Sequence, residues 1–198
     1  MMEKPLIIGF GGTTRPGSSS ERLVAAVLGH CEAAGAETAL FGGTDLVGLP
    51  HFAPECQDRT AAQARFVAAV RRADGLVIGT PGYHGGVSGL VKNAIDLLED
   101  TREDSRVYFE GMPVGIVVSA AGWQAGGVTL TALRAIIHAM RGWNTPLGIA
   151  VNSIEQRLFD ENGKLDPAID VLAAAQAQQI MPLARLSRAA RENKTETI

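Results

Sequence analysis

Five short runs of apolar, often β-branched residues recur along the chain, and longer stretches with helical spacing of apolar residues separate them. Nearly continuous apolar runs of this length are typical of strands that are buried on both faces. The predicted strands are Leu6–Phe10, Glu37–Phe41, Leu76–Gly79, Val114–Ser119 and Leu147–Val151. Strands that alternate with helices predict an α/β fold, in which helices cover both faces of a parallel sheet.

The predicted helices lie between and after these strands. They cover Ser20–Ala34, Ala61–Ala73, Gly86–Glu99 and Gly127–Met140, and a last Ala-rich helix begins near Pro167, because proline suits a first helical turn. Pro182 falls inside that last pattern, so we expect the helix to kink or end there. Glycines and prolines between residues 42 and 54 predict a long irregular loop after the second strand.

Composition indicates one globular domain, which we expect to cover residues 1–184. The chain has 198 residues, of which 46% are hydrophobic and 20% charged, as in ordinary globular proteins with a sizeable core. Residues 185–198 are rich in Arg, Glu and Lys, and we expect a charged C-terminal tail there, a solvated helix end that frays.

Charge and cysteine content narrow the function classes. A net charge of −3 lacks the basic excess of proteins that bind nucleic acid. No segment reaches the roughly 18 apolar residues of a membrane span, and Met1–Pro5 lacks the apolar stretch of a signal peptide. Cys31 and Cys56 have neither redox-motif nor zinc-site spacing, so no metal site is expected, and we interpret them as reduced thiols of a cytoplasmic protein.

The loop after the first strand has the residues of a phosphate site. Glycines 9, 11 and 12 precede Thr13, Arg15, Ser18 and Ser20, and a helix follows directly. A helix N-terminus offers free N–H groups and positive potential, hydroxyls add donors, and arginine adds a cationic fork. A Ser-rich helix cap without a ligand is the simpler alternative. Neither a Walker sequence nor an intact dinucleotide fingerprint is present.

The loop after the third strand has the residues of a site for a planar ligand. Thr80 is followed by Pro81, Gly82, Tyr83, His84 and Gly85, just before a helix. Ligands of open α/β sheets bind beyond the carboxyl ends of the strands, and glycines leave the backbone accessible to a ring. Tyr83 can pack on that ring. His84 is either a general acid or a surface histidine of which only the backbone matters.

Two further segments have a less specific pattern. In the loop after the fourth strand, Ser119, Ala120 and Gly122 leave backbone free for a ligand, and Trp123 either covers the ligand, joins a subunit contact or packs on the surface. In the helix after Tyr83, Leu97 lies off the apolar stripe of Leu90–Leu98. A second apolar edge of this kind indicates burial against a partner subunit or within one chain.

The loops together resemble the NAD(P)H-dependent FMN reductase family, which includes flavin, quinone, azo-dye and chromate reductases. The family's Gly-Ser-x-Arg-x-x-Ser pattern reads here as residues 12–18, with Thr13 in place of serine. Its Thr-Pro-Glu-Tyr-Asn-Gly-Ser pattern and the helix that follows match Thr80–Asp96, and Gly82 replaces Glu while His84 replaces Asn. Leu49–Phe52 also matches. The resemblance covers roughly residues 6–151.

The resemblance implies a flavodoxin-like three-layer sandwich with a five-stranded parallel sheet of order 2-1-3-4-5. It implies non-covalent FMN, with Thr13, Arg15, Ser18 and Ser20 on the phosphate, residues 81–85 along the ring, and Ser119, Ala120 and Gly122 on its other edge. It also implies a homodimer or homotetramer through the helix Leu90–Leu98. Gly82 and His84 depart from the pattern and bear on substrate range.

The leading hypothesis is an oxidoreductase that passes hydride from NADPH or NADH to FMN and then electrons to a quinone, a flavin or a similar small acceptor. The cofactor supplies that chemistry, so no catalytic acid or base of the protein is expected. Two alternatives stay open: a flavodoxin-like electron carrier for a protein partner, and a flavin-free binding or regulatory module on the same fold. A dehydrogenase with its own dinucleotide site ranks last.

Overall fold

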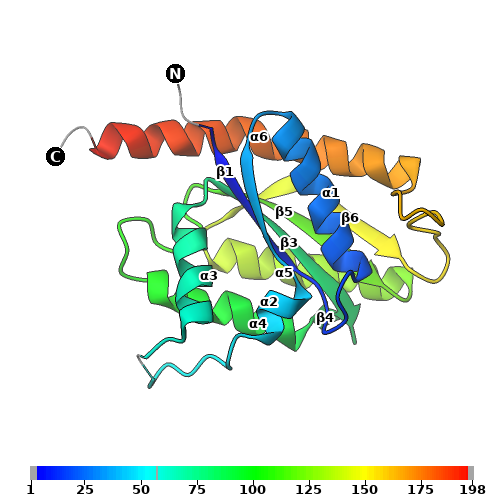
Figure 1. Ribbon diagram of the computed structural model, residues 1–198, viewed down its shortest axis with the longest axis horizontal. Helices are drawn as coiled ribbons and strands as arrows, with labels where there is room; N and C mark the ends of the chain where they lie inside the picture. Colours follow the sequence, from blue (N-terminus) through cyan, green and yellow to red (C-terminus); the bar gives the residue numbers. More distant parts are fainter. Residues whose placement is uncertain (1–3, 57, 196–198) are drawn as a thin grey trace.

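A parallel sheet forms the middle layer of the protein (Figure 1), and the computed structural model describes residues 4–56 and 58–195. The strands are β1 (Leu6–Gly11), β2 (Glu37–Phe41), β3 (Gly75–Tyr83), the two-residue β4 (Gly86–Val87), β5 (Pro113–Ala120) and β6 (Trp143–Asn152). The order is β2-β1-β3-β5-β6, with every neighbouring pair parallel, and β4 pairs with the end of β3 alone. Without β4 this is the predicted order 2-1-3-4-5.

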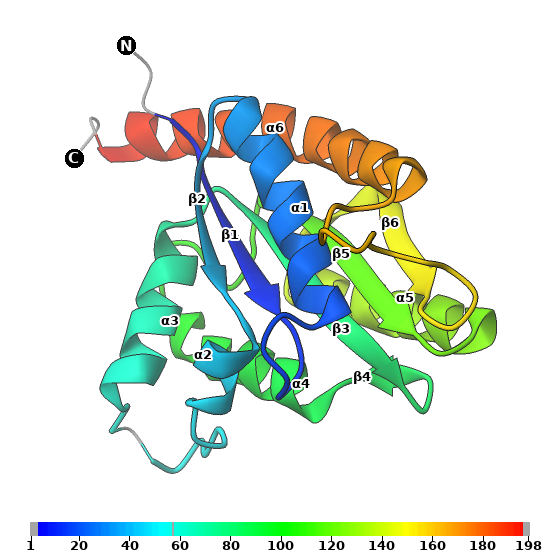
Figure 2. The same cartoon turned by 45° about the vertical axis from the view of Figure 1, so that its right-hand side comes forward.

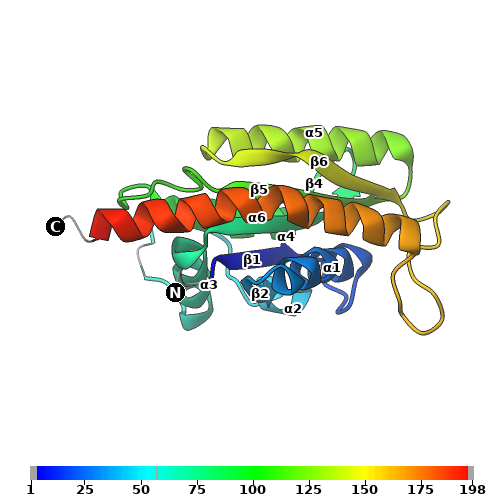
Figure 3. The same ribbon diagram turned by 90° about the horizontal axis from the view of Figure 1, so that it is seen from above.

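Helices cover both faces of this sheet (Figures 2 and 3). Helices α1 (Ser19–Ala33) and α6 (Pro167–Thr195) pack side by side on one face. The other face carries α3 (Ala61–Arg72), α4 (Gly89–Asp96), the 3-10 helix η1 (Leu97–Thr101) and α5 (Trp123–Ala139). The short helix α2 (Gly43–Val47) follows β2 directly, where we had expected only irregular loop. None of the described helices is both long and apolar enough to cross a membrane.

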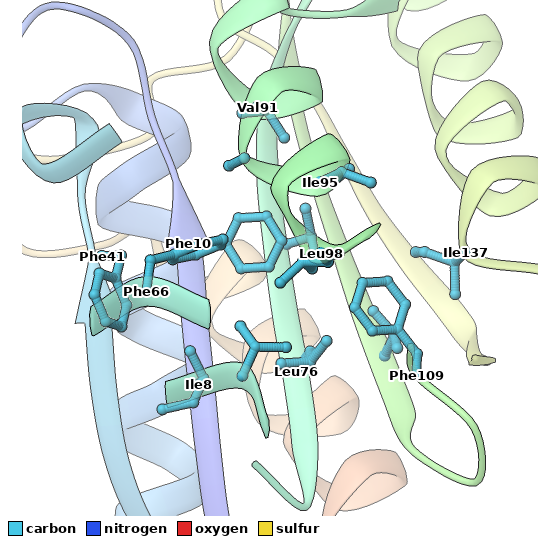
Figure 4. Close-up of a cluster of buried hydrophobic side chains, with 14 of the residues drawn as sticks. Ile8, Phe10, Phe41, Phe66, Leu76, Val91, Ile95, Leu98, Phe109 and Ile137 are labelled. Atoms are coloured by element: carbon cyan, nitrogen blue, oxygen red, sulfur yellow. The ribbon is translucent and has the colours of Figure 1, made fainter. Parts of the chain in front are cut away.

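Successive side chains of each strand point to opposite faces of the sheet, so the protein has two apolar cores. Ile8 and Phe10 point toward α3, whereas Ile7 points toward α1 and α6. Figure 4 shows the first core, where the Phe66 ring meets the Phe10 and Phe41 rings edge to face, with centroids 5.3 Å apart in each pair. Burial on both faces is the reason that these strands read as nearly continuous apolar runs.

Helix α6 differs from its prediction. It does not end at Pro182 but continues to Thr195, so the charged segment from Arg185 is helical through that residue. Ile180 and Ala184, on either side of the proline, are fully buried, and their packing offsets the hydrogen bond that proline removes, which costs about 3 kcal/mol in an unsupported helix. Beyond the proline, the Arg185 guanidinium donates to Ala34 O at 2.8 Å. Residues 196–198 of the expected tail lie outside the described residues.

The two cysteines are free thiols in contrasting surroundings. Cys31 is buried between α1 and the sheet, and Cys56 is exposed. Burial, with a smaller effect of the Glu32 charge, raises the pKa of the Cys31 thiol to about 12. Cys31 therefore stays protonated at neutral pH and acts as a small apolar core residue.

Candidate functional site

A cleft with a volume of about 370 Å³ lies at the carboxyl ends of the parallel strands. This is the end at which open α/β sheets bind ligands, and the volume lies in the range of small-molecule pockets. Nine of the predicted site residues line it: Thr13, Arg15, Ser18, Ser20, Pro81, Gly82, Tyr83, Ser119 and Ala120. The fold thus brings three loops, far apart in sequence, to one cavity.

The first loop presents hydroxyl groups and one guanidinium to this cleft. Ser18 is the N-cap of α1, yet its side chain makes no capping hydrogen bond. The buried Ser18 and Ser20 hydroxyls instead face each other, with 3.5 Å between their Oγ atoms. The loop backbone is fixed locally, since Arg15 N donates to Thr13 Oγ1 at 3.1 Å. Within the described part of the chain, the Arg15 guanidinium has no hydrogen bond or ion pair and lies exposed at the mouth.

Two glycines allow the strands and the first helix to converge here. A Cβ atom on Gly11 would lie 2.1 Å from Gly79 O, and the φ of Gly11 is +152°. On Gly79, a Cβ atom would lie 2.4 Å from Val24 Cγ2 of helix α1. A larger residue at 79 would push α1 and its hydroxyl-bearing first turn away from the sheet, whereas one at 11 would push β1 away from β3.

The second loop is a β-hairpin, which corrects two predicted boundaries. Strand β3 does not end at Gly79 but continues to Tyr83, where Gly82 and Tyr83 pair antiparallel with Val87 and Gly86. His84 and Gly85 form the two-residue turn with φ of +52° and +76°, the backbone of a type I′ hairpin. The helix that we expected from Gly86 begins only at Gly89. Glycine and proline in the sequence predicted a loop, but in the structure these residues belong to two short paired strands.

Contacts with neighbouring elements hold the hairpin in place. Thr80 Oγ1 accepts from Ser88 N at 3.1 Å, which fixes the exit of the hairpin. A Cβ atom on Gly85 would lie 3.3 Å from Val128 Cγ1, so the turn packs against α5. Tyr83 lines the cleft with 56% of its surface exposed, whereas His84 and Gly85 lie outside the lining. His84 holds the left-handed conformation of the first turn residue, with φ of +52°.

The third segment begins its helix earlier than predicted. Ser119 and Ala120 belong to β5, Gly122 is the N-cap of α5 with φ of +143°, and α5 starts at Trp123 rather than Gly127. Gly122 lies outside the cleft lining. The Trp123 Nε1–H donates to Glu155 Oε2 at 2.7 Å, which ties the start of α5 to the loop after β6.

Three further residues line the cleft. Ser19 and Ala121 lie within the first and third predicted loops, whereas Ser153 was not predicted. Ser153 follows β6, and Ser153 N donates to Ala120 O at 2.8 Å. The same rule that indicated the other loops, position just after a parallel strand, also applies to Ser153. The predicted strand ended one residue too early, at Val151, so Ser153 was not recognised as a residue at a strand exit.

The helix α4 and the turn after it bury the residues that had hinted at a partner subunit. Leu97 and Leu98 are fully buried inside the chain. The second apolar edge of this segment therefore packs in the core shown in Figure 4, where Val91, Ile95 and Leu98 face the sheet.

The strand order, and the cleft at the point between β1 and β3 where that order reverses, define a flavodoxin-like α/β protein. Solved structures share this fold. An NAD(P)H:acceptor flavoenzyme from Paracoccus denitrificans superimposes with a TM-score of 0.71 at 18% identity, over 89% of this chain and 97% of that one. An oxidoreductase from Corynebacterium diphtheriae gives 0.69 at 20% identity, over 91% and 97%.

The sequence assigns the chain within that class. The NADPH-dependent FMN reductase family matches residues 5–156, and the chain belongs to this family. An FMN-dependent NADPH-azoreductase from Staphylococcus aureus (strain USA300) is 38% identical over 80 residues, 40% of this chain and 39% of that protein. The same enzyme from Staphylococcus haemolyticus (strain JCSC1435) is 33% identical over 96 residues, 48% and 47%. The matched segment thus spans less than half of each relative.

Proposed function

We propose that the protein binds FMN in the carboxyl-end cleft and oxidises NADPH or NADH with it, to reduce a small acceptor such as a quinone, a flavin or an azo dye. The main support for this proposal is that the lining of the cleft has two chemically different halves. One half has four hydroxyl side chains and Arg15, and the other has a nearly side-chain-free wall.

The hydroxyl half fits the phosphate of FMN. Thr13, Ser18, Ser19 and Ser20 offer O–H donors, and the first turn of α1 offers backbone N–H groups. Arg15 offers a charge that has no ion pair among the described residues. Hydrogen bonds between such donors and a phosphate are stronger than those between neutral groups. The Ser18 hydroxyl, buried and without a capping bond, is available to a phosphate oxygen.

The other half fits the flat ring. Pro81, Gly82, Ala120 and Ala121 present backbone and small side chains, and Tyr83 adds an aromatic face at the rim. Backbone N–H and C=O groups in such a wall can bond the edge of a heterocycle, and the wall keeps water from one face of it. Gly85, His84 and Gly122 support this wall from outside.

The chemistry itself would come from the cofactor: FMN, when bound, accepts a hydride from NAD(P)H and passes electrons to the acceptor. Of the described residues that line the cleft, only Arg15 and Tyr83 have titratable side chains. The protein would therefore bind and orient, whereas proton transfer by a carboxylate or histidine in the lining is not part of the scheme.

The proposal extends to assembly and location. We expect a homodimer or homotetramer in the cytoplasm, as for the family pattern described above. The face of Leu90–Leu98 was the expected interface, but only Leu90 of its leucines stays partly exposed. The apolar surface that this helix offers to a partner is thus smaller than the sequence pattern implied. Sedimentation of the purified protein would measure the oligomeric state.

The decisive experiment combines a spectrum with an assay. The purified protein, desalted after incubation with FMN, should retain the visible flavin absorption, and NADPH should bleach it without oxygen. Steady-state oxidation of NADPH with a quinone or an azo dye should then depend on the added FMN.

Two outcomes separate the alternatives. Retained flavin with almost no NADPH or NADH oxidation would favour an electron carrier. A protein that binds no FMN at any concentration tested would overturn the proposal and favour a flavin-free module.

A further inference from the structure

Glu21 lies directly behind the loop that we assign to the FMN phosphate. It is in the first turn of α1, and its carboxylate turns away from the cleft toward the start of α2. Glu21 Oε2 accepts from Gly43 N at 2.8 Å, and Glu21 Oε1 accepts from Gly17 N at 3.4 Å. One side chain therefore links the phosphate loop, the helix behind it and the segment after β2.

Two glycines lie so close to the Glu21 carboxylate that a side chain on either would displace it. A Cβ atom on Gly42 would lie 2.9 Å from Glu21 Cδ, and one on Gly12 would lie 3.2 Å from Glu21 Oε2. A Cβ atom on Gly43 would meet Thr13 O at 1.9 Å, so the loop backbone also touches α2. The carboxylate thus sits in a nest of backbone groups, the kind of environment that binds anions.

The same carboxylate places a negative charge next to the phosphate half of the cleft. Between residues 12 and 22 the charged side chains are Arg15, Glu21 and Arg22. Arg22 is engaged elsewhere, on the Phe159 ring and on Gly163 O. Asp45, which accepts from Gly42 N at 3.1 Å, is paired with Arg65 at 2.6 Å. Arg15 and Glu21 then cancel in formal charge. A phosphate dianion would be held by hydroxyls and N–H groups rather than by a net positive field.

We propose that Glu21 is a positioning residue with two opposed effects on FMN binding. Its hydrogen bond with Gly43 holds the phosphate loop in shape, and its negative charge lowers the affinity for the FMN phosphate. The flavin is therefore exchangeable. This inference rests on the proposed function. It assigns the balance between a tightly held and a releasable flavin to one carboxylate outside the cleft lining.

Two substitutions separate the roles. Glu21→Gln keeps an acceptor oxygen for Gly43 N and removes the charge, whereas Glu21→Ala removes both. Glu37→Gln at the opposite end of the sheet is the control with the same change in net charge. Dissociation constants for FMN and for riboflavin, which lacks the phosphate, should be measured by flavin fluorescence, together with hydrogen exchange of the Gly43 amide in the flavin-free protein.

We expect Glu21→Gln to bind FMN roughly three- to tenfold more tightly at low salt, because a nearby like charge is removed. Riboflavin affinity should stay unchanged, and so should both affinities in Glu37→Gln. Glu21→Ala should lose the protection of the Gly43 amide and bind FMN more weakly than Glu21→Gln does.

The outcomes distinguish this inference from the proposed function. Wild-type protein that binds FMN, with equal FMN affinity in Glu21→Gln and Glu37→Gln, would overturn the charge effect alone. Equal Gly43 exchange in wild type and Glu21→Ala would overturn the anchoring role. Wild-type protein that binds neither flavin would overturn the proposed function, and the charge effect with it.

Discussion

The two ends of the sheet each carry a cavity with arginine in it, and they use arginine differently. The carboxyl-end cleft of about 370 Å³ has Arg15 at its mouth. A cavity of about 310 Å³ at the amino end is lined by Val70, Arg71, Thr101, Asp104, Ser105, Arg106, Tyr108 and Arg191. By size and charge alone, the amino-end cavity is an equally good candidate for an anion site.

The arginines at the amino end already hold the fold together. The Arg106 guanidinium donates to Ala73 O at 2.6 Å, to Arg71 O at 2.7 Å and to Val70 O at 3.0 Å, which satisfies the end of helix α3. Burial first, and then the neighbouring Arg191, lower the pKa of Arg106 to about 10. Arg191 pairs with the fully buried Asp74, and Arg71 pairs with Asp104 at 2.7 Å.

The comparison shows that an arginine in a cavity indicates a ligand site only when it does not already bind groups of the protein itself. Arg106 donates to three carbonyl groups at the end of α3, of which Val70 O also accepts from Ala73 N at 3.2 Å, and this role is structural. Arg15 has no such task within the described residues, and the Ser18 and Ser20 hydroxyls in the same cleft meet each other at 3.5 Å between their Oγ atoms. A ligand site at a strand end requires hydrogen-bond donors that converge there and are not already used by acceptors of the protein.

Removal of Arg106 should have the largest effect and should touch stability only. Arg106→Ala removes the buried guanidinium that donates to three carbonyl groups at the end of α3, which we expect to lower the free energy of unfolding by about 2–4 kcal/mol. Urea denaturation measures this, and FMN affinity should not change. The control is Arg102→Ala, an exposed arginine of the same region, which should leave stability unchanged. A loss of FMN affinity in folded Arg106→Ala would break the comparison.

Removal of Arg15 should do the reverse. Arg15→Ala takes away a charge-assisted contact with the phosphate, and we expect FMN affinity to fall roughly 10- to 100-fold. Riboflavin affinity and the urea midpoint should stay as in the wild type. If FMN is retained equally well in Arg15→Ala and Arg102→Ala, the phosphate assignment is wrong.

The hairpin turn gives the smallest and finest test. His84 adopts a left-handed conformation that asparagine accepts more readily, especially before glycine in a type I′ turn. We therefore expect His84→Asn to raise stability by about 0.5 kcal/mol and His84→Val to lower it by about 1 kcal/mol, as measured by thermal unfolding. NADPH oxidation by His84→Asn should match the wild type. A large loss of activity would instead assign the imidazole a direct role in the reaction.

The sequence predicted the parallel sheet and nine of the cleft residues, because buried strands and hydroxyl-rich loops have strong local patterns. The strand order followed from the family resemblance and not from those patterns. It failed where tertiary contacts decide. Pro182 reads as a helix end, but burial of its neighbours carries α6 through it. Strand β6 begins at Trp143, four residues before the predicted start, because an edge strand tolerates Pro146.

The same distinction applies at the hairpin. Nothing local separates Pro81–Gly86 as a loop from the same residues as a strand pair. The pairing needs α5 beside it, where Thr129 Oγ1 donates to Gly86 O at 3.5 Å. Likewise, the Glu21 link to Gly43 joins residues 22 positions apart, and it depends on how close β1 and β2 bring their exits.

The close packing around Gly82 limits which substitutions the protein can accept at this position. A Cβ atom at that position would lie 2.9 Å from the Ala120 Cβ and 3.0 Å from Thr129 Oγ1. A larger residue at 82, such as the glutamate of the family pattern, therefore requires a matching change on β5 or α5. Substitutions at 82, 120 and 129 form one correlated set, and a mutant library that varies them singly would miss the functional combinations.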